Sequence, residues 1–447
     1  MSWIDRLTSR LTGRAARRDA SAAGDAGWIS GPAVANRHVS AGLPHFQSTA
    51  GDQLDPRAGD GLANIRVRLR KAYTPAQPVT DRRLFAGRTR LLTSLIHTIE
   101  DQRLHTVLFG EAGLGKSSVL NVLAQTAREA RYKVISVTCG VGSSFDELFR
   151  QIAEGIPLLF HAGYGPTSPE AEAGATFASL LPAEPVSVRG AGDMLSRVEG
   201  ARILVIMDEF DITESDEFRR NVAELLKSLS DRSARVQVVM AGVAANLSEL
   251  TAHVPSIQRN LAALRIPRMT AAEIRALVKN GEAVGGVAFE DEAVNAIIAR
   301  SIGYPYLASM LCHRAALIAL DHGRTAISVE DVIVATDEAA DEFDGRASKR
   351  AQLQIDQRLR QGLGLRLGLL ASAAQAAEGR FTVEDIEGAE VDPAEIAAAR
   401  QLAVQLTEEG VVLIAEDDEL GRAYSFVEDS VRAGLWLRYA QARASRN

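Results

Sequence analysis

The chain has 447 residues, too many for one ordinary hydrophobic core, so two or three domains are expected. Hydrophobic residues make up 46% and charged residues 24%, which excludes a wholly disordered or fibrous protein. The formal net charge of -7 offers no large cationic field of the kind that nucleic-acid binders use, although it leaves a local basic patch open. Cys139 and Cys312 lack a CxxC spacing and predict buried apolar residues rather than a metal or redox site.

The N-terminal residues 1–18 predict a short interfacial helix. Trp3, Ile4, Leu7 and Leu11 fall on one helical face and arginines occupy the remainder, a pattern typical of peripheral membrane contact. A tail that docks on a protein partner or stays loose is the favoured alternative for so short a segment. No apolar run of about 18 residues and no secretory signal occur, so we expect cytoplasmic residence, with membrane association at the inner face left open.

Residues 1–61 are interpreted as this basic helix followed by a flexible linker rich in Ala, Gly, Ser and Pro. In residues 62–268 short apolar strands alternate with helices, which is typical of a parallel sheet covered by helices on both faces. Residues 156–190 interrupt this alternation and are interpreted as a surface insertion. The predicted strands are 105–109, 132–139, 203–207, 236–240 and 262–266.

Helices replace strands after residue 269. Residues 269–345 are predicted to form an all-α lid beside the sheet, with helices at 270–281, 290–301, 304–320 and 328–340. In residues 346–447 two helices precede two short strands joined by a turn, which resembles a winged helix.

One stretch matches the pattern GxxxxGK[ST] between a predicted strand and a predicted helix, and it reads Gly110-Glu111-Ala112-Gly113-Leu114-Gly115-Lys116-Ser117. Its glycines let backbone N–H groups turn inward around phosphate oxygens at the positive end of the helix. Lys116 is predicted to neutralise the β and γ phosphates, and Ser117 to bind Mg²⁺. Ser118 completes the cofactor-binding stretch and is expected to cap or pack the helix. The motif predicts ATP and Mg²⁺ as cofactors, and residues 62–268 as a P-loop ATPase core.

Two carboxylates follow the apolar strand at 203–207. Asp208 suits the Mg²⁺ shell, and Glu209 suits general-base activation of the water that attacks the γ phosphate. A lone acidic pair would favour a solvated strand end, but the upstream phosphate loop favours the catalytic interpretation. Asp211 is interpreted as a loop or helix-cap residue.

Residues 75–340 resemble the AAA+ superfamily, in the branch shared by STAND-type signalling ATPases and replication-initiator-like ATPases. Phe85-Ala86-Gly87-Arg88 is similar to the "F-x-G-R" box of this branch, which implies that Arg88 lies near the nucleotide base. Gly303-Tyr304-Pro305 is similar to its "G-x-P" element, which implies that Pro305 approaches the nucleotide.

Two features that the resemblance implies concern turnover. Relatives carry a polar residue at the end of the fourth strand, where this chain has Met240-Ala241-Gly242 and then Asn246. Arg259 lies where relatives carry an arginine that reaches the phosphate of a neighbouring subunit. A solvated or paired surface arginine is the other interpretation of Arg259.

The sequence favours an ATP-dependent molecular switch with slow Mg²⁺-dependent hydrolysis, an unidentified protein partner and self-association through the ATPase domain. The alternatives are an initiator-like DNA-binding ATPase, or a membrane-associated scaffold that binds nucleotide with little turnover. DNA is disfavoured because the second predicted helix of the winged-helix unit offers only Arg400 as a cation and the turn EDDELG is acidic.

Overall fold

The computed structural model describes residues 61–165, 167–213, 215–242, 255–377, 379–387, 391–418 and 421–444. The interfacial helix predicted at residues 1–18 and the position of Asn246 lie outside this part of the chain. Among the described helices, none combines the length and the apolar character that a membrane span needs. Cytoplasmic residence stays an expectation from the sequence.

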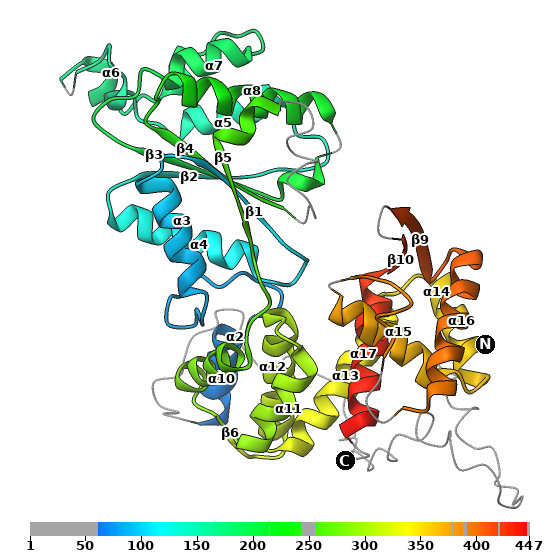
Figure 1. Ribbon diagram of the computed structural model, residues 1–447. Helices are drawn as coiled ribbons and strands as arrows, with labels where there is room; N and C mark the ends of the chain where they lie inside the picture. The colour runs from blue at the N-terminus through cyan, green and yellow to red at the C-terminus, as the bar shows by residue number, and fades with distance from the viewer. Residues whose placement is uncertain are drawn as a thin grey trace, which may run out of the picture.

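A parallel sheet with the strand order β2-β3-β4-β1-β5 forms the centre of the first unit. The strands are β1 (His105–Phe109), β2 (Lys133–Thr138), β3 (Ile203–Asp208), β4 (Val236–Gly242) and β5 (Leu261–Arg265). Helices α3 and α4 cover one face, and α5, α7 and α8 cover the other (Figure 1). The helices are α3 (Thr89–Glu100), α4 (Lys116–Glu129), α5 (Phe145–Glu154), α7 (Val188–Leu195) and α8 (Asp216–Asp231).

Apolar side chains point to both faces of the sheet. Along β3, Leu204 and Ile206 join the core under α3 and α4, whereas Val205 and Met207 join the core under α5 and α8. Burial on both faces explains why these strands show continuous apolar runs rather than an alternation of apolar and polar residues. The predicted sheet with helices on both faces is confirmed.

The segment predicted as a surface insertion, residues 156–190, folds into short helices against the α5 side of the sheet. They are η1 (Leu158–Phe160), α6 (Pro169–Glu172), η2 (Phe177–Leu180) and the start of α7. Phe177 is fully buried, and the Leu158 N–H donates to the Ala175 carbonyl at 2.8 Å. Helices of one turn leave no period for sequence analysis to detect.

The lid consists of four helices, α10 (Ala271–Gly285), α11 (Asp291–Ser301), α12 (Pro305–Asp321) and α13 (Val329–Arg346), with the strand pair β6 (Ala288–Phe289) and β7 (Ala326–Ile327). A helix from before the sheet, α2 (Leu62–Ala72), packs against α10 and α12. The sequence grouped α2 with residues 62–268, and in the structure its helix contacts are with the lid while its apolar residues share a buried cluster with the sheet. The apolar face of α2 predicts that the helix is buried, but it does not show which unit α2 packs against.

The C-terminal unit has a winged-helix arrangement, as predicted. Its helices are α14 (Lys349–Arg360), α15 (Gly364–Ala376), α16 (Pro393–Glu409) and α17 (Asp429–Ala444). Its antiparallel strands have the order β8 (Arg380–Phe381), β10 (Gly421–Phe426) and β9 (Leu413–Asp418). Helix α17 lies along α13 of the lid, so the two units share one packed surface (Figure 1).

His105 makes the stability of the sheet dependent on pH. It is 2% exposed, and its Nδ1 atom accepts a hydrogen bond from the Val238 N–H at 3.0 Å, which requires a neutral ring. Burial lowers the pKa of His105 from 6.5 to about 4. Between these values the unfolded chain binds more protons than the folded chain, so stability falls as pH falls through this window, by about 3 kcal/mol in total.

We expect His105→Asn to flatten this acid loss, because Asn can present an oxygen acceptor to Val238 but does not titrate. Urea unfolding of both proteins at pH 7, 6, 5 and 4 measures the two slopes. Equal slopes would show that His105 is not the group responsible.

Candidate functional site

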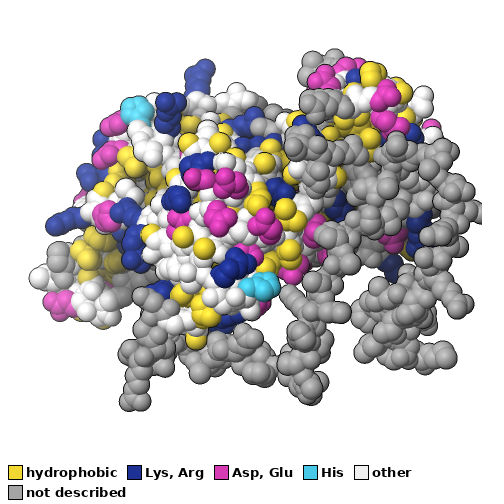
Figure 2. Space-filling model, turned by 90° about the horizontal axis from the view of Figure 1, so that it is seen from below, with side chains coloured by type: hydrophobic (Ala, Val, Ile, Leu, Met, Phe, Trp, Pro, Cys, Tyr) yellow, Lys and Arg dark blue, Asp and Glu magenta, His cyan; other side chains and the backbone are white. Residues whose placement is uncertain are grey.

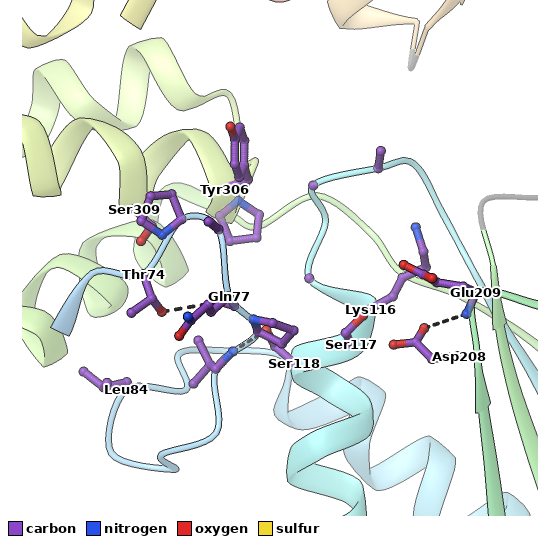
Figure 3. Close-up of a pocket in the computed structure, with 18 of the residues that line it drawn as sticks. Thr74, Gln77, Leu84, Lys116, Ser117, Ser118, Asp208, Glu209, Tyr306 and Ser309 are labelled. Carbon is purple, nitrogen blue, oxygen red and sulfur yellow. Dashed lines mark hydrogen bonds between the residues drawn. The ribbon is translucent and has the colours of Figure 1, made fainter. Parts of the chain in front are cut away.

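A cavity of about 400 Å³ lies where the sheet, the lid and the segment after α2 meet. One side is formed by the loop between β1 and α4 and by the carboxyl end of β3. The other side combines the first turn of α12 with residues 74–79, which we call the strap. Figure 3 shows Lys116 and Asp208 on the first side and Thr74 and Tyr306 on the second. A ligand in this cavity would contact the sheet unit and the lid together.

The loop between β1 and α4 is shaped to surround an anion. Gly115 has a φ angle of 83°, in the left-handed region that favours glycine, and α4 begins at the next residue, Lys116. An ideal Cβ at Gly115 would lie 3.6 Å from the Cγ atom of Pro305, so the loop and the lid already touch here. The unpaired N–H groups of the first turn of α4 therefore lie at the cavity, where they can bind phosphate oxygens.

Lys116 brings a cation to this cavity. Its Nζ atom donates to the backbone carbonyls of Gly110 and Glu111, at 2.7 and 2.9 Å. Burial lowers the pKa of Lys116, whereas the carboxylates of Asp211, Asp208 and Glu111 raise it. An incoming phosphate would exchange the two carbonyl bonds for stronger charge-assisted bonds.

Asp208 and Glu209 stand together at the end of β3. The Oδ1 atom of Asp208 accepts a hydrogen bond from the Glu209 N–H at 3.0 Å. Glu209 has a φ angle of 56°, a left-handed conformation that costs a non-glycine residue of the order of 1–3 kcal/mol. Its side chain is exposed in the cavity. Backbone strain of this kind gathers at functional sites, which supports a chemical role for Glu209.

Helix α4 holds the strap through polar side chains on one of its faces. Ser118 Oγ accepts a hydrogen bond from the Val79 N–H at 3.0 Å, and the Asn121 side-chain amide donates to the Val79 carbonyl at 3.3 Å. One turn further along, Gln125 donates to the carbonyl of Thr80 at 2.5 Å. Ser118 therefore fixes the strap beside the loop.

Glu111 does not line the cavity but joins a cluster that spans three units of the chain. Its carboxylate accepts hydrogen bonds from the Tyr304 hydroxyl at the start of α12 and, at 3.4 Å each, from Arg268 and from Arg432 of α17. Arg268 also donates to the Tyr304 hydroxyl at 2.8 Å and lies over its ring. Burial and the bond to Glu111 raise the pKa of Tyr304, so its hydroxyl stays protonated and donates.

The other predicted site residues lie in different surroundings. Pro305 lines the cavity, and Leu114 is buried in the core beneath the loop. Arg88 precedes α3 and is 7% exposed, but it does not line the cavity. Its N–H donates to Glu273 of α10 at 2.7 Å, and its Nη1 and Nη2 atoms have no partner among the described residues. Burial lowers the pKa of Arg88 to about 10.

Arg259 lies at the exposed end of η4 (Pro255–Arg259), before β5, and is not among the residues that line the cavity. Arg259 therefore does not line the cavity of its own chain. The role across a subunit interface that the resemblance implies stays a prediction.

Several residues of the cavity were not predicted from the sequence. Tyr306, Ser309 and Leu277 come from the lid, and Asp211 follows the carboxylate pair on η3 (Phe210–Ile212). Tyr306 directly follows Pro305, so its position next to a predicted site residue could have indicated that it lines the cavity. Leu277 looks like any apolar position of an amphipathic helix, so nothing in the pattern marked it as part of a site.

The groups present fit a nucleoside triphosphate and a divalent cation. Lys116 and the loop N–H groups would hold the phosphates, and the oxygens of Ser117 and Asp208 are the ligand type that Mg²⁺ prefers. The rest of the cavity is lined by the strap and by side chains of the lid, and it would hold the less charged part of the ligand.

A match to a protein-family model agrees with this chemistry. Residues 76–322 match the model of a family described as novel STAND NTPase 1. Among the curated proteins, none matches the sequence. Cdc6p from Pyrobaculum aerophilum is 14% identical, with a TM-score of 0.46 over 85% of this chain and 99% of that one. The Orc1 protein of Aeropyrum pernix, solved in complex with DNA, is 15% identical, with a TM-score of 0.44 over 82% and 96%. A Walker-type ATPase of Pyrococcus abyssi is 14% identical, with a TM-score of 0.47 over 80% and 98%.

The family match confirms the resemblance to STAND-type ATPases. It covers more than half of the chain and includes the phosphate loop, the carboxylates after β3 and the lid helix α12. The chain therefore belongs to the novel STAND NTPase 1 family.

Proposed function

We propose that the chain is an ATP-dependent molecular switch that binds Mg²⁺-ATP between sheet and lid, hydrolyses it slowly and reorients the lid and the C-terminal unit between nucleotide states. The position of Glu111 carries this proposal. Its backbone carbonyl binds Lys116, and its carboxylate binds the lid through Tyr304 and the C-terminal unit through Arg432. A rearrangement of the phosphate loop is thereby transmitted to both units.

Lys116 connects the cavity to Glu111. Its ammonium donates to the Glu111 carbonyl at 2.9 Å, and a triphosphate would draw the ammonium away because phosphate is the stronger acceptor. The Glu111 backbone would then be released, and its carboxylate could leave the cluster with Arg268 and Arg432. Ligand binding would thus weaken contacts between units rather than only fill a cavity.

The C-terminal unit is held to the lid independently of the loop. Arg438 of α17 binds Asp341 and Asp344 of α13 at 2.7 and 2.5 Å, and the Trp436 indole N–H donates to the Arg300 carbonyl at 2.9 Å. These contacts favour joint movement of lid and C-terminal unit. The contacts of Glu111 with Arg432 and Tyr304 instead tie both to the sheet unit, so they are the contacts that the switch would break.

For hydrolysis, Glu209 would accept the proton of the attacking water while Lys116 holds the transferred phosphate. Ser117 and Asp208 would hold Mg²⁺, which supplies charge neutralisation of the phosphates when bound. Arg259 would act on the site of a second copy if the chain self-associates.

An unidentified protein is the partner that we propose for the C-terminal unit. The strand pair β9 and β10 carries Glu416 and Asp417, and Arg400 on α16 is exposed. On the described part of the face shown in Figure 2, basic and acidic side chains lie interspersed. A DNA backbone needs a continuous cationic surface, so the alternative of a DNA-binding initiator stays disfavoured.

Arg432→Ala tests the switch. We expect it to slow the release of a bound, slowly hydrolysed fluorescent triphosphate about three- to tenfold, because binding no longer has to break a contact of roughly 1 kcal/mol between Glu111 and the C-terminal unit. Stopped-flow fluorescence after mixing with excess unlabelled nucleotide measures the rate.

Arg438→Ala is the matched control, since it removes a guanidinium that binds α17 to the lid but does not contact the loop. Release at the wild-type rate in Arg432→Ala would contradict the coupling, and so would an equal change of the rate in both variants.

A further inference from the structure

The strand at the centre of the site offers no polar side chain to the cavity. Strand β4 lies between β3 and β1, and its last residue, Gly242, lines the cavity. The two residues before it, Met240 and Ala241, are buried and apolar. Among the described residues, a polar group at this end of β4 therefore comes from a neighbouring element.

Asp211 provides such a group. An ideal Cβ on Gly242 would lie 2.6 Å from the Oδ1 atom of Asp211 and 2.9 Å from its Cβ and Cγ atoms, closer than real Cβ atoms approach. The side chain of Asp211 thus occupies the volume that any side chain at position 242 would need. Within the described part of the chain, the carboxylate accepts no hydrogen bond, so it is available to groups that enter the cavity.

Asp211 and Lys116 line the same cavity. Among the carboxylates that stabilise the Lys116 ammonium, it has the largest effect, ahead of Asp208 and Glu111. The strap closes the opposite side of the cavity, so a phosphate chain held by the loop would end at these carboxylates. Asp211 lines this cavity on η3, a few residues after Asp208 and Glu209, so the terminal phosphate would lie near it.

We infer that Asp211 is a positioning residue for the terminal phosphate, seated at the end of β4 because position 242 is a glycine, and that it directs the Lys116 ammonium toward this phosphate. The inference deepens the proposed function and rests on it. In the reaction, the bond from the water oxygen to the γ phosphorus forms, the bond from this phosphorus to the β,γ-bridging oxygen breaks, and Glu209 takes the proton. Asp211 takes no part in the proton transfer.

Asp211→Asn separates turnover from binding. We expect kcat to fall about 10- to 100-fold, because a small misplacement of the reacting group is costly. The affinity for ADP should stay within about twofold, and the affinity for ATP relative to ADP should rise about three- to tenfold, since a negative charge leaves the neighbourhood of the γ phosphate. Phosphate release and calorimetry with each nucleotide measure these quantities, and thermal melting verifies the fold.

Glu217→Gln, which removes the same charge from the exposed first turn of α8, should leave all three quantities unchanged. Gly242→Ala should reproduce the Asp211→Asn result, because the added methyl group displaces the carboxylate. Combined with Asp211→Gly, it should cost nothing further, because the carboxylate and the Cβ atom that the methyl group would meet are already gone.

The outcomes separate the two proposals. A folded wild-type chain that binds no nucleotide overturns both. A chain that binds ATP without turnover still tests Asp211 through the ratio of ATP to ADP affinity. Unchanged kcat and ratio in Asp211→Asn, or fully multiplicative effects of the substitutions at 211 and 242, would overturn the inference alone.

Discussion

Lys116→Ala is expected to weaken Mg²⁺-ATP binding about 30- to 5,000-fold. The ammonium is the cation that the phosphate loop holds at the cavity, and its hydrogen bonds to the described residues go to carbonyl oxygens that it can exchange for phosphate. Removing one partner of a buried charge pair costs roughly 2–5 kcal/mol, which gives this range of dissociation constants. Isothermal calorimetry with a slowly hydrolysed analogue measures the loss without interference from turnover.

Lys133→Ala controls for loss of charge. Lys133 is the first residue of the edge strand β2, and the phosphate loop instead follows the last residue of β1. This variant should bind as the wild type does. Binding by Lys116→Ala within threefold of the wild type would remove the phosphate loop from the nucleotide site and leave the cavity without its proposed ligand.

The parts of this site that could be predicted from the sequence are those encoded by a few adjacent residues. The phosphate loop needs its glycines, Lys116 and Ser117 in fixed order, and the pair Asp208 and Glu209 follows an unmistakably apolar strand. Both patterns are local, because in each of them one short backbone segment carries all the residues that would bind the ligand. The parallel sheet could also be predicted from the sequence, since strands buried on both faces form continuous apolar runs.

The contacts between units were not predictable in this way. Glu111 and Arg432 are 321 positions apart, and neither residue type nor spacing pairs them. In the sequence, Asp211 is indistinguishable from an ordinary loop carboxylate. Its position depends on the space beside Gly242 of β4, which has no side chain, and the sequence does not show that the two residues are neighbours. Helix α14 was missed because it buries little more than Ala351 and Ile355, too weak an apolar stripe for its charged surroundings.

Glu209→Gln is the substitution with the clearest expected separation of chemistry from binding. Glutamine has nearly the same shape but accepts no proton, so turnover should fall about 10²- to 10⁴-fold, the usual contribution of a general base. ATP affinity should be preserved, because the loop and Lys116 are untouched. The backbone of residue 209 is left-handed with either side chain, so the strain at this position does not change and melting temperatures should agree.

The same turnover assay at several protein concentrations decides the place of Arg259. An exposed arginine outside the cavity of its own chain can assist hydrolysis only at the site of another copy. Wild-type turnover per chain would then rise with concentration, and Arg259→Ala would stay at the low-concentration value. Turnover that is independent of concentration and equal in Arg259→Ala would exclude this arginine from the chemistry. Turnover unaffected in Glu209→Gln would require another base, and Asp208 or Asp211 would be the nearest carboxylates to examine.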